Sequence, residues 1–145
     1  MSSLDKLSKV NDICLFVDDF KGSLEFYTEK FGFKVKRLQP DEVHANYAEF
    51  DFCGTSVTLW DKKGVLEIIN AEDLGEHGHR FMIAVKVPQV KDVDDIYEEL
   101  MEKGVTCIKE PITYPFGSRA AYFCDHEKNI WEVFAWEEGN GPGLL

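Results

Sequence analysis

The sequence predicts an α+β fold built from two copies of a strand–helix–strand–strand–strand (βαβββ) module. Short segments of alternating apolar residues, typical of strands, are separated by two segments with helical spacing of their apolar residues. The same order of elements occurs twice, and the halves align: residues 13–17 correspond to residues 83–87, and Asp51 corresponds to Asp125. A module of about 60 residues would struggle to bury a core alone. Two such modules, curled face to face, could enclose a cleft.

The first module is expected over residues 9–70, after an N-terminal lead over residues 1–8. Its predicted elements, in order, are a strand at 12–17, a helix at 20–31, a strand at 34–38 and a hairpin of strands 45–52 and 56–61. Asp18 or Asp19 can cap the helix, and Gly32 ends it. Residues 65–70 are interpreted as a further short strand, in the part of the chain that is hardest to assign.

Residues 71–79 are expected to link the modules, with the second module over residues 80–137 and a flexible tail at 138–145. Its predicted elements, in order, are a strand at 81–87, a helix ending at Gly104, a strand at 105–109, a loop at 111–117 and a hairpin of strands 119–124 and 130–136. The turn over residues 125–129 contains the Asp and Asn residues that favour chain reversal.

Glu132 is the unusual residue of the last predicted strand, because it is a carboxylate in an otherwise apolar segment. Strand faces alternate, so Glu132 lies on the same face as Ile130 and Phe134. A charge at that position reaches solvent, is paired, or lines a cavity that uses it. We consider three roles in this order: an ion pair with Arg119, contact with a cationic ligand, and catalysis as a base.

The charge and cysteine content exclude several classes of protein. The net charge of −11 disfavours nonspecific binding to nucleic acid and to anionic membranes. No apolar run approaches the length of a membrane span, and the N-terminus lacks a signal-peptide core, so we expect a cytoplasmic protein. The four cysteines are widely spaced without a CxxC pair, and we interpret them as small apolar residues that stay reduced.

Two segments carry a family resemblance. They are VDDFKGSLEFYTEKFGF (residues 17–33) and PFGSRAAYFCDHEKNIWEVF (residues 115–134). The chain resembles the vicinal oxygen chelate superfamily, which groups glyoxalase I, bleomycin-resistance proteins and extradiol dioxygenases. The second segment is similar to the family's ending, although His126 stands where Pro is common and Lys128 where Gly is common. The resemblance covers about residues 10–137 and implies sheets that curl into an open, barrel-like cleft, often completed by a second subunit. We therefore expect a homodimer.

The resemblance also implies where a metal would bind. The family's ligand positions correspond here to Asp12, Thr58, Met82 and Glu132, and only Glu132 is a usual ligand for its position. Two carboxylates, a hydroxyl and a thioether are a poor set of donors for nickel, zinc or iron. We therefore expect no metal, with a divalent nickel, zinc or iron ion as the alternative.

The four histidines offer little help to a metal site. His77 and His79 could supply imidazoles only if the alignment slipped by three residues, which would invert the apolar alternation of the strand at 83–87. We interpret them as a solvated pair in the linker. His44 and His126 are expected to be exposed.

The function that these observations favour is capture of a flat or amphipathic small organic molecule in an aromatic-lined cleft, without metal. The predicted binding residues are Phe16, Tyr47, Thr58, Trp60, Phe116, Arg119, Tyr122 and Phe134, beside Glu132. Ligand binding should then change the fluorescence of Trp60 or Trp131.

Two other function classes stay open. The first is a metal-dependent glyoxalase I-type lyase or isomerase (lactoylglutathione lyase-like), or a dioxygenase-like enzyme, with Glu132 as base or metal ligand. The second is an interaction domain whose dimer surface is its purpose, which a cleft filled by side chains would favour. Metal content and the effect of Glu132→Gln on activity would separate the enzyme from the binding protein.

Overall fold

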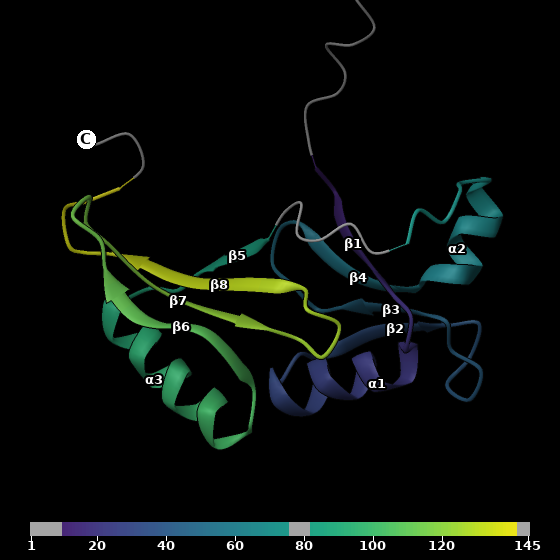
Figure 1. Ribbon diagram of the computed structural model, residues 1–145, viewed down its shortest axis with the longest axis horizontal. Coiled ribbons are helices and arrows are strands. Elements are labelled where there is room, and N and C mark those ends of the chain that lie inside the picture. Colours follow the sequence, from purple (N-terminus) through teal and green to yellow (C-terminus); the bar gives the residue numbers. More distant parts are fainter. Residues whose placement is uncertain (1–9, 76–81, 142–145) are drawn as a thin grey trace, which may run out of the picture. The chain divides into compact units, whose positions relative to one another are not determined.

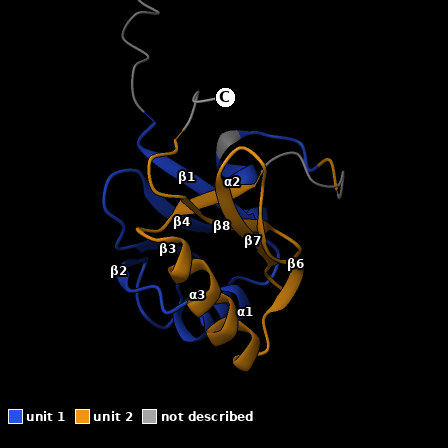
Figure 2. Ribbon diagram, turned by 90° about the vertical axis from the view of Figure 1, so that its left-hand side faces the viewer, with its two compact units in different colours: residues 1–73 blue, residues 74–145 orange. Residues whose placement is uncertain are grey.

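A computed structural model describes residues 10–75 and 82–141 (Figure 1). The chain divides into two compact units, unit 1 ending at Asp73 and unit 2 beginning at Leu74 (Figure 2). This division falls inside the segment predicted to link the modules. Within the described residues, no helix is long and apolar enough to span a membrane.

Unit 1 has the predicted βαβββ order followed by one additional helix. Its elements are β1 (Asp12–Val17), α1 (Phe20–Glu25), the π-helical turn η2 (Phe26–Lys30), β2 (Val35–Gln39), β3 (Tyr47–Phe50), β4 (Ser56–Asp61) and α2 (Lys62–Ile69). The sheet order is β1-β4-β3-β2, with β1 parallel to β4 and the other pairs antiparallel. The βαβββ order predicted for the first module is therefore confirmed.

The helix of unit 1 begins and ends as its sequence indicates. The Asp19 carboxylate accepts a hydrogen bond of 3.0 Å from the Gly22 N–H and so caps the first turn. Gly32 follows the helix with a φ of 72°, the left-handed conformation that glycine tolerates best. Between these ends lies Tyr27, fully buried, whose ring stacks on Phe33 with centroids 5.7 Å apart. The Tyr27 ring also meets Phe50 of β3, with centroids 5.8 Å apart, and this contact holds the helix against one face of the sheet.

The short strand predicted over residues 65–70 was wrong, because this segment belongs to helix α2. The Asp61 carboxylate accepts a hydrogen bond of 3.0 Å from the Gly64 N–H at the start of the helix. At its end, Asn70 adopts a φ of 56°, and the Ala71 N–H donates to the Leu66 carbonyl at 2.9 Å. Capping at both ends outweighs the β preference of the valine and isoleucines between them.

Unit 2 repeats this architecture. Its elements are β5 (Ile83–Lys86), α3 (Val90–Glu102), β6 (Thr106–Thr113), β7 (Ser118–Cys124) and β8 (Ile130–Trp136). The sheet order is β5-β8-β7-β6, with β5 parallel to β8 and the other pairs antiparallel. The second βαβββ module is thus confirmed, and α3 packs its apolar stripe, including Val93 and Leu100, onto one face of this sheet.

The loop predicted over residues 111–117 was partly wrong, because β6 continues through Pro111 to Thr113. β6 is an edge strand, and its pairing with β7 shifts between Lys109 and Ile112. A proline is tolerated in such a strand because its missing N–H removes no regular ladder hydrogen bond. The chain then turns at Gly117, where φ is 90°.

The tight turn between β7 and β8 is confirmed, and Asp125 organises it. This carboxylate is only 3% exposed and accepts hydrogen bonds from the backbone N–H groups of Glu127 and Asn129 and from the Asn129 side chain, at 2.8–2.9 Å. Lys128 has a φ of 68°. That left-handed conformation gives a physical reason for glycine at this place in related sequences.

Candidate functional site

The two faces of β8 differ in what they contact. Trp131 is 1% exposed and lies on the face that packs against α3. Glu132 and Phe134 are half-buried and lie on the opposite face. The register of β7 and β8 places Tyr122 directly opposite Glu132 on this second face. The predicted sharing of one face by Ile130, Glu132 and Phe134 agrees with this register.

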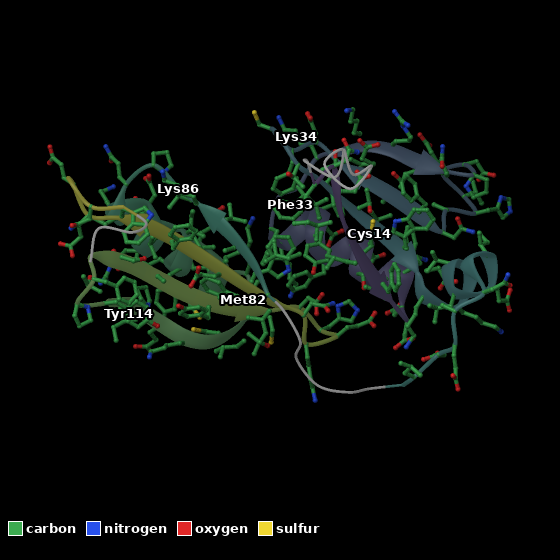
Figure 3. All side chains as sticks on the ribbon, turned by 90° about the horizontal axis from the view of Figure 1, so that it is seen from above. Cys14, Phe33, Lys34, Met82, Lys86 and Tyr114 are labelled. Atoms are coloured by element: carbon green, nitrogen blue, oxygen red, sulfur yellow. The ribbon has the colours of Figure 1, made fainter. Side chains whose placement is uncertain are left out.

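A row of aromatic rings runs along the face of the second sheet that carries Glu132. Tyr114 stacks on Phe116 with centroids 5.1 Å apart, and Tyr114 can be located in Figure 3. Phe116 meets Trp136 at 6.3 Å, and Trp136 meets Phe134 at 6.4 Å. We call these four residues the aromatic row. The Phe116 side chain is 45% exposed, so part of the row is open to a ligand.

Glu132 lies at one end of a chain of hydroxyl groups. The Tyr122 and Tyr114 hydroxyl oxygens are 3.2 Å apart, and the Tyr122 side chain also hydrogen-bonds to Glu132. Burial, these two hydrogen bonds and the negative charge of Glu132 raise the pKa of Tyr122 well above its ordinary value. Tyr122 therefore stays protonated at neutral pH, and its hydroxyl is a donor rather than a base.

Arg119 does not belong to this site, and the expected pair with Glu132 was wrong. Arg119 pairs across the sheet with Ala135, on the face that packs against α3. Its guanidinium donates to both carboxylate oxygens of Asp94 in α3, at 2.8 and 2.6 Å, and to the Thr113 hydroxyl at 2.9 Å. The hydrogen bond from Arg119 lowers the pKa of Asp94. Strand alternation separates Arg119 from Glu132, because Arg119 lies opposite Ala135, three residues from Glu132, and an odd offset places the two side chains on opposite faces.

The predicted residues of unit 1 also share one sheet face. The register places Phe16 and Tyr47 on either side of Trp60. The Tyr47 and Trp60 rings meet edge to face at 4.6 Å, and the Trp60 indole N–H donates to the Thr58 hydroxyl at 3.0 Å. Phe16 is 41% exposed, whereas Thr58 is only 2% exposed. The structure therefore brings these four residues together, with Thr58 already engaged.

Glu49 is a residue of this face that the sequence did not single out. It pairs across the sheet with Thr58 and is 12% exposed. Lys36 and Arg37 lie 3.6 and 3.7 Å from its carboxylate, so its charge is neutralised within unit 1. Burial, followed by the charge of Glu49, raises the pKa of Tyr47. The ion-paired residues come from the neighbouring strands β2 and β3, and only the strand register could have revealed their contact.

The positions at which the family places metal ligands do not carry a suitable set of donors. Asp12 lies on the Thr58 face of β1 and β4, but the Thr58 oxygen accepts the Trp60 indole N–H. Met82 offers a thioether just before β5 (Figure 3) and is 46% exposed. In the described ranges 10–75 and 82–141, no group of three His, Cys, Asp or Glu side chains could hold a metal ion. These donors do not fit a nickel, zinc or iron site.

The histidines add no ligand to these positions in the described part of the chain. His77 and His79 lie outside the described residues. His44 and His126 are exposed, as expected, and His44 hydrogen-bonds to the Asp41 carboxylate at 3.1 Å. The four cysteines are all free.

Comparison with known proteins identifies the family. The Glyoxalase/Bleomycin resistance protein/Dioxygenase superfamily matches residues 9–133. Because that stretch is most of the chain, the protein belongs to this superfamily, and the resemblance noted in the sequence is confirmed.

Three relatives illustrate the match. The uncharacterized protein YraH of Bacillus subtilis (strain 168) is 34% identical over 130 residues, which cover 87% of this chain and 97% of YraH. The crystal structure of a glyoxalase/bleomycin resistance protein/dioxygenase from Nocardioides is 32% identical, with a TM-score of 0.80 over 95% of this chain and 89% of that one. The lactoylglutathione lyase of Agrobacterium tumefaciens is 20% identical, with a TM-score of 0.67 over 88% of this chain and 93% of that one, and so shares the fold.

Proposed function

We propose that the protein binds a small, flat organic molecule against the aromatic row of unit 2, without a metal ion. One observation carries the proposal: Tyr114, Phe116, Phe134 and Trp136 line the same sheet face as Glu132. Ring faces supply apolar contact area for a flat ligand, and a nearby carboxylate and hydroxyl supply polar contacts that orient it. The binding surface thus has the composition of a small-molecule site.

The same residues favour binding over metal-dependent catalysis. A glyoxalase I-type lyase or a dioxygenase-like enzyme would need several strong ligands around one ion, and the family's ligand positions here supply a thioether and an engaged hydroxyl. Elemental analysis of protein purified without chelators tests this choice. Binding without metal predicts less than about a tenth of an equivalent of nickel, zinc and iron together, whereas about one equivalent would favour the lyase.

The proposal includes a homodimer and a cytoplasmic location. The homodimer follows from the family resemblance, and sedimentation velocity at micromolar concentration checks it. The cytoplasmic location is supported by four cysteines without a disulfide, as expected in a reducing compartment. The net charge of −11 makes nucleic acid and anionic membranes poor partners, which leaves a small molecule as the proposed partner.

Tryptophan fluorescence provides the direct test of ligand binding. Trp136 belongs to the aromatic row, whereas Trp131, which the sequence also suggested as a reporter, is 1% exposed on the opposite face. A Trp60→Phe variant, which removes the tryptophan of unit 1, is titrated with soluble one-ring and two-ring aromatic compounds of positive, neutral and negative charge. We expect saturable quenching of Trp136 by at least one compound.

Matched variants then locate the binding surface. Phe116→Ala removes a half-exposed ring from the aromatic row and should weaken binding about tenfold. Phe16→Ala removes a similarly exposed ring from unit 1 and should leave binding unchanged. Absence of saturable quenching, or binding that is insensitive to Phe116→Ala, would contradict the proposed function.

A further inference from the structure

The charge of Glu132 is not neutralised by a cationic side chain in the described part of the chain. Among residues 10–75 and 82–141, no lysine or arginine lies within ion-pair distance of its carboxylate, and its partner is the Tyr122 hydroxyl. One hydroxyl donor satisfies only one of the roughly four acceptor sites of a carboxylate. Within the described residues, most of the hydrogen-bonding capacity of the Glu132 carboxylate is therefore open to another group.

The arginine on the neighbouring strand cannot supply that charge. Arg119 points to the other face of the sheet, where Asp94 holds it through two hydrogen bonds. In unit 1, by contrast, Glu49 lies on the corresponding side of its sheet with two cationic neighbours. The fold thus accommodates a neutralised carboxylate on such a face, whereas Glu132 has no lysine or arginine partner within the described residues.

The aromatic row already holds one positive charge of the protein itself. The Lys109 ammonium lies 5.6 Å from the centre of the Tyr114 ring, within the range of a cation–π interaction. Lys109 pairs across the sheet with Tyr122, so this contact occurs beside the chain of hydroxyls that leads to Glu132. An exposed lysine that could extend into water instead lies over a ring face, which indicates that this surface favours cations.

We infer that the ligand of unit 2 is an organic cation, with a quaternary or protonated ammonium group attached to a flat apolar frame. The inference rests on the proposed function and narrows the class of its ligand. The ammonium group lies between the Glu132 carboxylate and the ring faces of the aromatic row, where Coulomb attraction and cation–π attraction act together. The Tyr122 hydroxyl orients the carboxylate, and the net charge of −11 attracts cations to the surface.

Three probes of matched shape test the charge preference. They are (4-hydroxyphenyl)trimethylammonium, 4-tert-butylphenol and 4-hydroxybenzenesulfonate, which share a phenol ring and a tetrahedral group and differ in charge. Isothermal titration calorimetry of the full chain at low ionic strength should give the cation at least about tenfold higher affinity than the neutral probe, and the anion the lowest affinity. This preference should shrink as salt is added.

Two variants assign the preference to the named residues. Glu132→Gln keeps the shape and should remove most of the tenfold preference while leaving the affinity for 4-tert-butylphenol within about twofold. Lys109→Met removes the competing ammonium without touching Glu132 and should raise the affinity for the cationic probe about twofold or more. Circular dichroism confirms that each variant is folded.

The outcomes separate this inference from the proposed function. Equal affinities for the three probes, all weakened by Phe116→Ala, would keep the aromatic binding site and overturn the cation preference. A preference that survives Glu132→Gln unchanged would likewise overturn the inferred role of the carboxylate while keeping the binding site. Binding of none of the probes would overturn both the inference and the proposed function.

Discussion

The two units share the βαβββ topology and differ in the sheet face opposite the one on which α1 and α3 pack. In unit 1 the central polar groups of that face contact one another, since Trp60 donates to Thr58 and Glu49 lies near Lys36 and Arg37. In unit 2 the corresponding strand of the sheet carries Glu132, whose described partner is the Tyr122 hydroxyl. A face that satisfies its own polar groups is structural, and one that leaves a charge without a counter-charge is suited to binding.

The difference arises from single positions on equivalent strands. Thr58 and Glu132 both lie in the last strand of their βαβββ modules, each beside an aromatic residue two positions later. In unit 1 that aromatic residue is Trp60, whose N–H donates to the threonine. In unit 2 it is Phe134, which has no polar hydrogen to donate. Duplication of one module followed by divergence at such positions can therefore leave one structural face and one binding face.

The largest expected effect is the loss of stability when a buried aromatic side chain between helix and sheet is removed. It tests whether this helix–sheet core contributes equally in both units. Trp131→Ala in unit 2 and Tyr27→Ala in unit 1 each remove a side chain that is at most 1% exposed, and each should lower the free energy of unfolding by about 3–5 kcal/mol. Trp136→Ala, on the half-buried face, should lower it by less than about 2 kcal/mol. Urea denaturation measures all three. A loss for Trp136→Ala equal to that for Trp131→Ala would remove the distinction between the faces.

The next largest effect on stability comes from a comparison of the Glu49 and Glu132 carboxylates. Glu49→Gln removes a charge that lies near Lys36 and Arg37, and should lower the free energy of unfolding by about 0.5–1 kcal/mol. Glu132→Gln removes a charge without a cationic neighbour among the described residues, and should leave stability unchanged or raise it. Thermal denaturation at pH 7 and low salt measures the pair. A larger loss for Glu132→Gln would mean that Glu132 is a structural residue.

A further test concerns the internal hydrogen bond of unit 1. Thr58→Val keeps the shape of the side chain but removes the acceptor of the Trp60 indole N–H, and should lower the free energy of unfolding by about 1 kcal/mol. Thr58→Ser keeps the acceptor and serves as the control. The valine variant should also shift Trp60 fluorescence toward that of a more hydrated indole. Equal stability of the valine and serine variants would show that this bond contributes nothing.

The smallest expected effect on stability concerns the ion pair between Arg119 and Asp94, on the sheet face opposite Glu132. Because Arg119 lowers the pKa of Asp94, the pair stabilises the protein above the ordinary Asp value of about 4, and this contribution is lost as pH falls through the lowered pKa. Asp94 is 42% exposed, so Asp94→Asn should lower the free energy of unfolding by only about 0.5–1 kcal/mol at pH 7, and by progressively less as the pH falls below the ordinary Asp value of about 4.

Urea denaturation across pH checks this dependence, with Glu98→Gln at an exposed position of the same helix as the control. A loss for Asp94→Asn that is equally large at pH 7 and pH 3 would contradict the assigned pair.

Local patterns in the sequence predicted much of the fold. They gave wrong assignments where residues outside the local segment determine the secondary structure. The strand at Asp12–Val17 and the turn at Asp125 follow from alternation and from Asp and Asn chemistry within a few residues. Helix α2 was missed because its first turn and its cap at Asp61 precede the segment that suggested a strand. The length of β6 was missed because Pro111 is acceptable only at the edge of a sheet, which no local pattern reveals.

The residues of the candidate site were also predicted only in part, because strand alternation is visible in the sequence and contacts between distant segments are not. Alternation alone placed Glu132 and Phe134 on one face, and the register then added Tyr122 opposite Glu132. Tyr114 and Trp136 were missed because they join the aromatic row through the turn at Gly117 and the end of β8. Arg119 was assigned to the wrong face because its partner, Asp94, is distant in the sequence and lies on a helix.

By itself the sequence determined the repeated module, the family and the presence of a carboxylate within an apolar strand, because each depends on spacing along the chain. Only the tertiary structure decided which charges are neutralised. Ion pairs such as Arg119 with Asp94, and Glu49 with Lys36 and Arg37, depend on strand register and helix packing. Coulomb attraction acts through space over a few ångströms, so the sequence cannot show that Glu132 has no cationic neighbour among the described residues.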